Sequence, residues 1–290
     1  MISVILAVMV SIILFFLLVM YYDCHRFVTV TYDIESEKIT GEYTFVLLSD
    51  LHNKTFGEKN EKLLTQIKAL SPDAVLVAGD MLTAFDNAEK CKVAAELMKE
   101  LAADYPVYYG MGNHEHRIGL CQGEFREIYD AYIEKLYQFG IEPLINESVY
   151  LPSANINISG LQVDRCYYRK VRKYPMPEGY MERLLGAPRK DSLQILIAHN
   201  PDYFTDYAKW GADLTVSGHV HGGLMRLPFL GGVMSPKLTL FPAYDGGRYE
   251  QDRSVMIVSR GLGTHTLPIR IFNPGELAVL RLHPVSHRQI

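Results

Sequence analysis

Five short apolar runs in this sequence are each followed, within four residues, by side chains that can bind metal ions. Short runs of this kind, bounded by glycine or polar residues, are typical of buried strands. Asp, His and Asn follow the runs, which are Phe45–Leu48, Ala74–Ala78, Val107–Tyr109, Ile195–Ala198 and Leu214–Val216. Ligands of open α/β sheets bind at the carboxyl ends of the strands, so this pattern predicts a binding site at one sheet edge.

Helical and further strand patterns complete the domain. Apolar residues recur at three- and four-residue spacing in the predicted helices, which are Glu61–Leu70, Glu89–Ala103, Glu124–Phe139 and the shorter Tyr180–Leu185 and Pro201–Trp210. Residues 149–163 are predicted as antiparallel strands broken at Pro152 and Gly160, and Ser254–Ser259 and Glu276–Leu282 as closing strands. Strands that alternate with helices, together with antiparallel strands, predict an α/β or α+β layered domain.

The segment from Ile2 to Tyr22 contains no charged residue and is almost entirely apolar. About 20 apolar residues in a helix span the roughly 30 Å hydrocarbon core of a bilayer. A cleaved signal peptide is the alternative, but its apolar region is shorter, follows a basic residue and ends in a small-residue cleavage site. We therefore expect a single-pass anchor of the cell membrane over residues 1–26 and one soluble domain over residues 27–290. Arg26 is the one basic residue directly after the run. A bias of one basic residue is too small to determine on which side of the membrane the domain lies.

Charge and cysteine spacing exclude two classes of function. The chain of 290 residues carries 29 basic and 33 acidic side chains, so it has no basic excess and we expect no nucleic-acid partner. The four cysteines stand far apart with no CxxC pair, which excludes a zinc ribbon and a disulfide-dense scaffold. The sequence leaves the oligomeric state open, and also whether the cysteines are free.

The residues after the five runs indicate which metal ions the site would take. Imidazole combined with carboxylate and amide oxygen suits Mn, Fe, Zn, Co or Ni, and the absence of cysteine from the motifs argues against a thiolate zinc site. Alternate residues of an extended segment point to the same side, so His219 and His221 could reach adjacent ions. One carboxylate can bridge two cations about 3.5–4 Å apart, which clamps the entering and leaving oxygens of a phosphoryl displacement.

In this order and after these strands, the motifs resemble those of the calcineurin-like metallophosphoesterases. The matching residues are Asp50-x-His52, Gly79-Asp80, Gly112-Asn113-His114-Glu115, His199 and Gly218-His219-x-His221. The tail segments 259–264 and 268–270 are similar to the membrane-associated bacterial branch with an N-terminal hydrophobic segment. One departure is that Met81-Leu82-Thr83 follows Gly79-Asp80, where the family often has a second Asp.

The resemblance implies a four-layer fold, in which two packed mixed sheets are flanked by helices, and a centre of two divalent ions. Mn is the expected ion, with Fe, Zn, Co and Ni as alternatives. The implied ligands are Asp50, His52 and His221 for one ion, Asn113, His199 and His219 for the other, and Asp80 as the bridge. A metal-bound hydroxide would attack phosphorus, and His114 would be the catalytic general acid, oriented by a neighbouring acid.

The implied function is a membrane-anchored, metal-dependent phosphoric ester hydrolase of the phosphodiesterase or pyrophosphatase type. Residues 165–174 contain five basic residues and three tyrosines, which suits either a solvated loop or contacts to phosphate and anionic lipid headgroups. The candidate contacts are Arg169, Lys170, Arg172 and Lys173. Leu224–Phe241 is either local core or an apolar wall for acyl chains beside the site. A phosphate ester is therefore the expected substrate, and a lipid-linked ester is one candidate.

Two other functions are compatible with the same residues. One is a non-catalytic scaffold that keeps the fold, although the presence of all seven ligand types and His114 argues against it. The other is an anchored binding module for anionic lipid, in which residues 165–174 would recognise the headgroup. Metal-dependent turnover would distinguish the enzyme from both.

Overall fold

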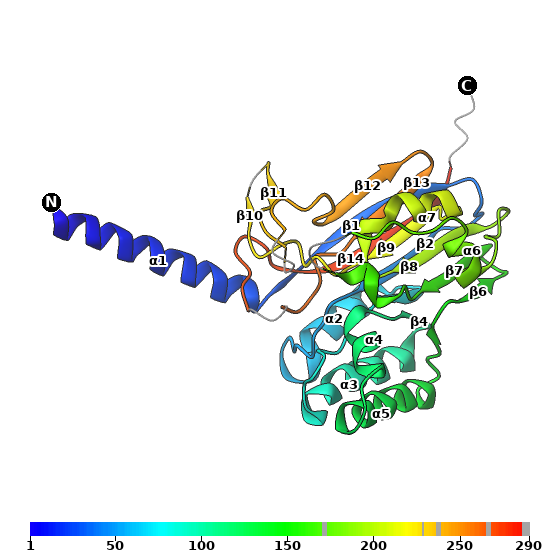
Figure 1. Cartoon of the computed structure of the whole chain (residues 1–290), viewed down its shortest axis with the longest axis horizontal. Helices are drawn as coiled ribbons and strands as arrows, with labels where there is room; N and C mark the ends of the chain where they lie inside the picture. Colours follow the sequence, from blue (N-terminus) through cyan, green and yellow to red (C-terminus); the bar gives the residue numbers. More distant parts are fainter. Residues whose placement is uncertain (170–172, 228, 236–238, 265–267, 286–290) are drawn as a thin grey trace.

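Two six-stranded mixed sheets pack face to face at the centre of the domain (Figure 1). The computed structural model describes residues 1–169, 173–227, 229–235, 239–264 and 268–285. The first sheet consists, in spatial order, of β1 (Phe27–Ser36), β14 (Gly275–Pro284), β2 (Tyr43–Leu48), β3 (Ala74–Ala78), β4 (Val107–Gly110) and β5 (Pro143–Leu144). The second consists of β12 (Gly247–Gln251), β13 (Ser254–Val258), β9 (Leu214–Ser217), β8 (Leu193–Ala198), β7 (Ile156–Leu161) and β6 (Glu147–Leu151).

Helices cover the outer face of each sheet and complete four layers. The first sheet is covered by α2 (Glu61–Leu70), α3 (Ala88–Asp104) and α5 (Glu124–Gln138), and the second by α6 (Tyr180–Leu185) and α7 (Phe204–Trp210). The short helix α4 (Asn113–Gly119), three 3-10 segments (Glu58–Asn60, Arg165–Tyr168 and Pro201–Tyr203) and the small hairpin of β10 (Arg226–Leu227) and β11 (Gly231–Gly232) lie in the connections. The fold class predicted from the sequence is confirmed.

The side chains of the central strands alternate between two cores. In β2, Phe45 and Leu47 lie in the core between the sheets, whereas Val46 and Leu48 pack against the helices. A strand that is buried on both faces must be apolar throughout, which is why the sequence shows continuous runs. All five runs form strands, and the predicted helices agree with the observed ones to within a residue or two at each end, with a 3-10 turn opening the last of them.

The predicted break at Gly160 is wrong, whereas the break at Pro152 is confirmed by a turn over residues 152–155. Strand β7 continues through Gly160 to Leu161. A Cβ atom on Gly160 would collide with Leu144 of β5, so this glycine marks a close approach between the two sheets and not a strand end.

Strand β1 has no counterpart in the sequence prediction. Only Ile34 is buried among its ten residues, so it lacks the apolar run that identifies a central strand. It is held at the sheet edge by parallel pairing with β14, from Phe27 opposite Gly275 to Ser36 opposite Pro284. Its position therefore depends on a partner that is distant in the sequence.

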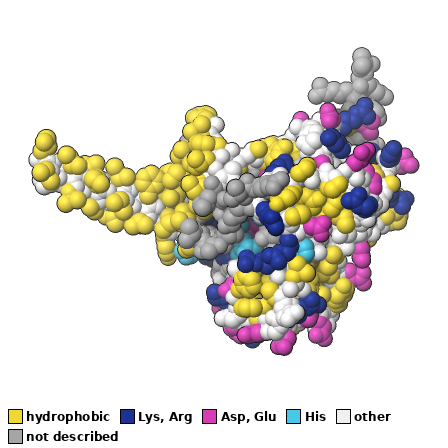
Figure 2. Space-filling view, in the orientation of Figure 1, with side chains coloured by type: hydrophobic (Ala, Val, Ile, Leu, Met, Phe, Trp, Pro, Cys, Tyr) yellow, Lys and Arg dark blue, Asp and Glu magenta, His cyan; other side chains and the backbone are white. Residues whose placement is uncertain are grey.

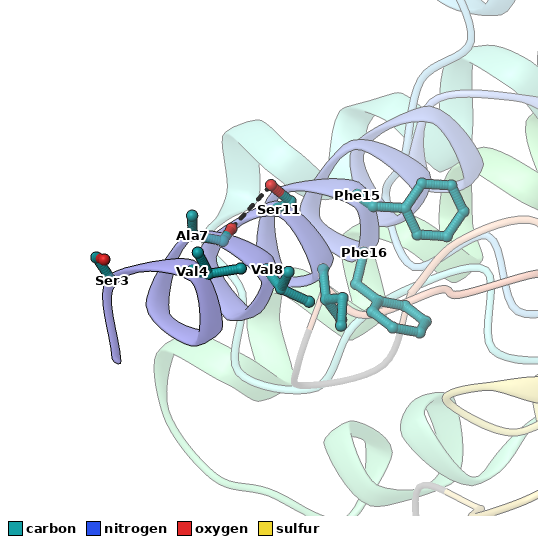
Figure 3. A pocket seen from close by; sticks show the side chains of 8 residues that line it. Ser3, Val4, Ala7, Val8, Ser11, Phe15 and Phe16 are labelled. Carbon is teal, nitrogen blue, oxygen red and sulfur yellow. Dashed lines mark hydrogen bonds between the residues drawn. The ribbon is translucent and has the colours of Figure 1, made fainter. Parts of the chain in front are cut away.

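Helix α1 (Ile2–Cys24) projects away from the domain (Figure 1). By its length and composition it could cross a membrane. Figure 3 shows one face of this helix, where the Ser11 hydroxyl donates to the carbonyl oxygen of Ala7 at 2.9 Å. This hydroxyl is therefore satisfied within the helix, as an apolar environment requires.

The last turn of α1 belongs to the domain. Asp23 is only 2% exposed, and one of its carboxylate oxygens accepts the N–H of Asn273 at 3.0 Å. The other oxygen pairs with Arg26 at 2.8 Å. Cys24 is also buried, and its thiol lies 3.4 Å from the carbonyl oxygen of Pro268. The packed part of the fold therefore begins at Asp23, within the segment predicted as the anchor.

We expect a chain that lacks residues 1–22 to be more stable than one that lacks residues 1–26. The first keeps the buried Asp23 carboxylate, and a hydrogen bond to a charged group contributes about 1.5–3 kcal/mol. The second should melt several degrees lower when unfolding is followed by circular dichroism. Asp23→Asn in the longer fragment is the matched control for the charge, and equal melting temperatures for both fragments would contradict this role of Asp23.

Candidate metal centre

The seven side chains predicted as metal ligands meet at the carboxyl ends of strands from both sheets. Asp50 and His52 follow β2, Asp80 follows β3, Asn113 begins α4 just after β4, His199 follows β8, and His219 and His221 follow β9. Strands β2, β3 and β4 are parallel to one another, as are β8 and β9. Parallel strands place their carboxyl ends at the same edge, which brings together residues that are far apart in the sequence.

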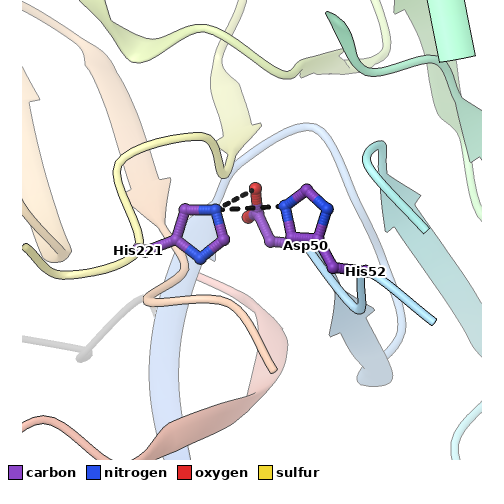
Figure 4. A group of neighbouring side chains, drawn as sticks. All are labelled: Asp50, His52 and His221. Carbon is purple, nitrogen blue, oxygen red and sulfur yellow. Dashed lines mark hydrogen bonds and ion pairs between the residues drawn. The ribbon is translucent and has the colours of Figure 1, made fainter. Parts of the chain in front are cut away.

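Asp50, His52 and His221 form the first group of donors (Figure 4). The Nε2 atom of His221 lies 3.3 Å from Oδ1 of Asp50 and 3.2 Å from Nε2 of His52. Two ligands about 2.1 Å from one cation, at angles of about 90° to 109°, stand about 3.0–3.4 Å apart. These three buried side chains therefore have the spacing of ligands around one ion.

Asp80, His199 and His219 form the second group, and Asn113 lines the same cavity as His219. The Nε2 atom of His199 lies 3.0 Å from Oδ2 of Asp80. Its Nδ1 atom lies 2.6 Å from the carbonyl oxygen of Ala78, which fixes the ring with Nε2 facing the donor group. The Oδ1 atom of Asn113 is buried and has no hydrogen-bond partner among the described residues, so a cation would satisfy it.

The carboxylate of Asp80 lies between the two groups. It belongs to a set with His199 and His219, and also to a set with His52 and His114. The Nε2 atom of His52 is 4.0 Å from Oδ2 of Asp80, the same oxygen that faces His199. Such a shared carboxylate has the position of a bridge between two cations. The residues present therefore fit a centre of two divalent ions.

Five of the seven ligand residues have a left-handed backbone, with φ between +50° and +73°: Asp50, His52, Asp80, His219 and His221. The expectation of an extended segment from His219 to His221 is therefore wrong. Left-handed turns at both histidines, and not strand alternation, direct their rings to different donor groups. This conformation costs a non-glycine residue about 1–3 kcal/mol, so backbone strain is concentrated at the site.

Fixed donors hold the carboxylate of Asp50. The hydroxyl of Ser49 donates to Oδ2, and the N–H of His219 lies 3.0 Å from each carboxylate oxygen. Gly218 permits this approach, because a Cβ atom there would collide with the side chains of Ser49 and Asp50. The carboxylate is therefore oriented by the protein itself.

Burial and mutual charge shift the ionisation of the ligands. Burial raises the pKa of Asp50 to about 6. Burial also opposes ionisation of Asp80, but the charge of His199 holds the pKa of this carboxyl well below its usual range. Burial alone would lower the pKa of His199, yet the neighbouring Asp80 raises it to about 9. Because ligands must lose protons to bind a cation, metal uptake by this site should weaken as the pH falls.

Two contacts orient His114. Its Nδ1 atom accepts the backbone N–H of Ala84 at 2.8 Å, and its own backbone N–H donates to Oδ1 of Asp80 at 2.8 Å. In the neutral ring the proton must then be on Nε2, which lies 4.0 Å from Oδ2 of Asp80. Burial lowers the pKa of His114, which favours the neutral ring.

A cavity of about 1060 Å³ opens onto these residues, and its lining includes His52, Asn113, His114 and His219. Basic side chains gather beside histidines on this face (Figure 2). Arg169, a predicted substrate contact, lines the cavity, together with Lys90, Arg117 and Arg165, which the sequence did not single out as contacts. Lys173 instead donates to the backbone oxygen of Asp202 at 2.5 Å. The other two predicted contacts, Lys170 and Arg172, lie outside the described residues.

The profile of the calcineurin-like phosphoesterase family matches residues 43–223, which is more than half of the chain. This chain belongs to the calcineurin-like phosphoesterase family. The matched region contains all seven candidate ligands, and the two-sheet fold is consistent with the match.

Curated relatives of this phosphoesterase come from several organisms. The uncharacterized metallophosphoesterase YkuE of Bacillus subtilis is 26% identical over 90% of this chain and 87% of its own length. A transmembrane protein with a metallophosphoesterase domain from Danio rerio is 28% identical over 80% of this chain and 51% of its own. The phosphodiesterase YaeI of Escherichia coli is 25% identical over 67% of this chain and 66% of its own. This chain spans 62% of the length of its Campylobacter and Helicobacter relatives.

Glu115 of this phosphoesterase is a positioning residue that the ligand prediction did not include. It is fully buried, and its Oε2 atom accepts the N–H groups of Asp80 at 2.9 Å and Gly112 at 3.1 Å. Its Oε1 atom accepts the N–H of Leu82 at 3.1 Å and the hydroxyl of Tyr109 at 3.2 Å. Glu115 thus ties the loop after β3 to the start of α4. The sequence signal is a glutamate at the third helical position, which reaches back as in a capping box.

The tail, residues 259–273, supports the backbone of the first donor group. The N–H of Gly263 donates to the carbonyl oxygen of Asp50 at 2.7 Å. The side chain of Asn273 donates to the carbonyl oxygen of His221 at 2.8 Å. Arg270 is buried and donates to backbone oxygens of the same tail, including that of Gly263. The closing segment therefore fixes the backbone of two candidate ligands.

We expect Glu115→Ala to weaken Mn²⁺ binding by about 10–100-fold, the usual cost of losing a group that orients a ligand. Glu115→Gln should fall between Ala and the parent, because its amide oxygen can still accept two of the N–H groups. Titration calorimetry on metal-free protein measures the affinities. Glu100→Ala, at an exposed position of α3, is the control and should bind Mn²⁺ like the parent. Parental affinity in Glu115→Ala would contradict the positioning role.

Proposed function

We propose that this chain hydrolyses a phosphodiester or pyrophosphate bond at a centre of two cations. The observation that carries the proposal is the pair of donor groups joined at Asp80, which border a cavity lined with basic side chains. Family membership supports phosphoester chemistry, and the Escherichia coli relative is named a phosphodiesterase.

The residues of both donor groups would hold the ions. The first ion would take Asp50, His52 and His221, the second Asn113, His199 and His219, and both would share Asp80. Carboxylate, amide and imidazole donors favour Mn, with Fe, Zn, Co and Ni as alternatives. Two divalent cations would supply Lewis acidity and an activated water at the phosphorus. The protein's own contribution is to keep the donors oriented through Ser49, Glu115 and the tail.

His114 would act on the leaving group. Because the N–H of Ala84 occupies Nδ1, the neutral ring presents its proton at Nε2, next to Asp80 and at the cavity wall. We propose that Nε2–H donates to the leaving oxygen as charge develops there. A positioned proton donor contributes about 10²–10⁴-fold to the rate, and most where the leaving group is a poor one.

Basic side chains around the cavity would bind the anionic substrate. Arg117, Arg165 and Arg169 are exposed and line the same cavity as His114 and His219. Guanidinium groups match phosphate oxygens in a bidentate manner, which suits recognition of a phosphate ester. Their charge would also concentrate anionic substrates at the site.

Helix α1 would place this domain at a bilayer. Its length and hydropathy are sufficient for a single span of the cell membrane, and the Danio rerio relative is named a transmembrane protein. We propose residues 1–26 as the anchor segment, with Asp23 packed on the domain, and residues 27–290 as the catalytic domain. An enzyme held at a membrane surface would meet lipid-linked phosphate esters, which makes them candidate substrates.

We expect removal of metal by a chelator to abolish turnover of bis-p-nitrophenyl phosphate, and Mn²⁺ to restore it. Asp80→Ala should lose both ions, because this carboxylate faces both donor groups. His114→Ala should keep both ions and lose about 10²–10⁴-fold in kcat, with a larger loss for alkyl than for aryl leaving groups. Elemental analysis of each variant, together with turnover rates, measures both effects.

Each part of this prediction can fail separately. Turnover by metal-free protein would contradict the proposed chemistry, and metal-loaded protein without turnover of any ester would favour the scaffold or the lipid-binding module. Loss of an ion from His114→Ala would instead make His114 a ligand, as its place in a donor set with His52 and Asp80 also permits.

We expect the double variant Arg165→Gln, Arg169→Gln to raise KM by up to about thirtyfold, because exposed charge contacts contribute up to about 1 kcal/mol each. The kcat value should change little, and the effect should diminish as salt screens the charges. Lys173→Gln is the matched control, since Lys173 contacts Asp202 and is not among the cavity-lining residues described.

Comparison of bis-p-nitrophenyl phosphate with phosphatidylglycerol in mixed micelles distinguishes a soluble from a lipid-linked ester. An unchanged KM for both substrates at low salt would contradict the role of these arginines.

A further inference from the structure

The described part of the chain exposes a group of large apolar side chains at the base of α1. They are Phe229, Leu230, Leu240, Phe241 and Phe272, which we call the apolar collar. Phe229 is fully exposed, Leu230, Leu240 and Phe241 are each more than half exposed, and Phe272 is 43% exposed. Figure 2 shows a hydrophobic lobe beside the base of the helix. Exposed apolar groups of this size mark a surface that contacts another apolar phase.

The collar is one connected structure, although its residues come from three segments. The backbone N–H of Arg226 in β10 donates to the carbonyl oxygen of Ile271 at 3.0 Å, next to Phe272. Strand β10 pairs with β11, and Phe229 and Leu230 lie at the tip of this hairpin. The N–H of Phe241 then donates to the carbonyl oxygen of Val233, just beyond β11, at 3.0 Å. The three segments therefore present their apolar side chains from one small unit.

The collar is continuous with the apolar surface of α1. The ring of Phe272 lies 6.4 Å from the ring of Phe15 and 6.3 Å from that of Phe16, measured between centroids. Phe16 is six residues before Tyr22, which corresponds to about 9 Å along the helix axis. Phe272 therefore packs beside the apolar segment itself, about 9 Å before the segment ends at Tyr22.

The length of α1 leaves little freedom in how deeply the helix can lie in a bilayer. Twenty-one residues from Ile2 to Tyr22 extend about 31 Å, close to the roughly 30 Å of a hydrocarbon core. Tyr21 and Tyr22 are exposed at the end next to the domain, where tyrosine is typical of the membrane interface. A helix that spans in this register carries Phe15 and Phe16 inside the hydrocarbon. Phe272, which contacts both rings, must then be inside it as well.

We infer that the apolar collar inserts into the membrane leaflet next to the domain, as a second contact beside the helical anchor. The collar would contact the hydrocarbon core and the interfacial zone of the bilayer. This inference rests on the membrane anchoring proposed above. It also replaces the apolar wall for acyl chains expected from the sequence, because no described collar residue lines the cavity. The one charged residue between 227 and 241, Lys237, lies outside the described residues.

Insertion would fix the orientation of the catalytic domain on the bilayer. A single helix allows rotation about its axis, whereas a second contact off the axis restricts it. The collar hairpin starts a few residues after His221, and Asn273, next to Phe272, donates to the carbonyl oxygen of His221. The membrane contact is therefore connected directly to the backbone of a candidate metal ligand.

Fluorescence quenching by brominated phosphatidylcholine in vesicles that contain the full chain tests this inference. Phe229→Trp and Phe241→Trp report on the collar, Phe15→Trp on the anchor, and Tyr137→Trp on an exposed aromatic position of α5. The native Trp210 is only 5% exposed, and the parent spectrum corrects for it. We expect both collar variants to lose emission to a degree comparable with Phe15→Trp, and Tyr137→Trp to lose none.

The reference positions make each failure distinct. If Phe15→Trp is quenched and neither collar variant is, the collar is in water and the inference is wrong while the anchor stands. Emission that shifts to the blue without quenching would assign the collar to contact with a second copy of the chain, which also overturns the inference. If no variant is quenched, α1 is not in the bilayer, and the membrane part of the proposed function fails too. Turnover of bis-p-nitrophenyl phosphate by the same samples reports separately on the hydrolase.

Discussion

The candidate site depends on one buried carboxylate, that of Asp80. It faces His199 at 3.0 Å and is shared by sets of donors that come from both sheets. Its Oδ1 atom accepts the N–H of His114 at 2.8 Å, and its own N–H is bound by Glu115. Since these contacts join the segments that follow β4 and β8 to Asp80, which itself follows β3, displacement of this residue would separate the two donor groups. The packed sheets serve to bring these strand ends to one place.

The strain of the ligand backbone is compatible with a stable protein because the strand segments just before it are so well buried. The runs that lead into Asp50 and Asp80 are largely or wholly inaccessible to solvent and pack on both faces. Burial of apolar area there provides the free energy that holds the left-handed residues in place. Rigid strands followed by strained turns give a site whose donors are already oriented, which lowers the cost of assembling a metal centre.

Hydrogen bonds connect the N-terminal helix, the tail and the candidate site. Asp23 binds the backbone of Asn273, whose side chain in turn binds the backbone of His221. The same tail brings Phe272 against the rings of α1. A chain of direct contacts therefore connects the proposed membrane anchor with a candidate ligand.

The sequence by itself determined the layered fold, the central strands and the residue types delivered to the strand ends. These follow from local patterns, because a strand buried on both faces is apolar throughout and a ligand must be carboxylate, amide or imidazole. Only the tertiary structure decided that β7 continues through Gly160, that β1 pairs with β14, and that Lys173 turns away while Arg117 lines the cavity. It also decided that left-handed turns direct His219 and His221, and that Glu115 supports Asp80. Each of these depends on contacts between segments far apart in the chain, which no local pattern of residues encodes.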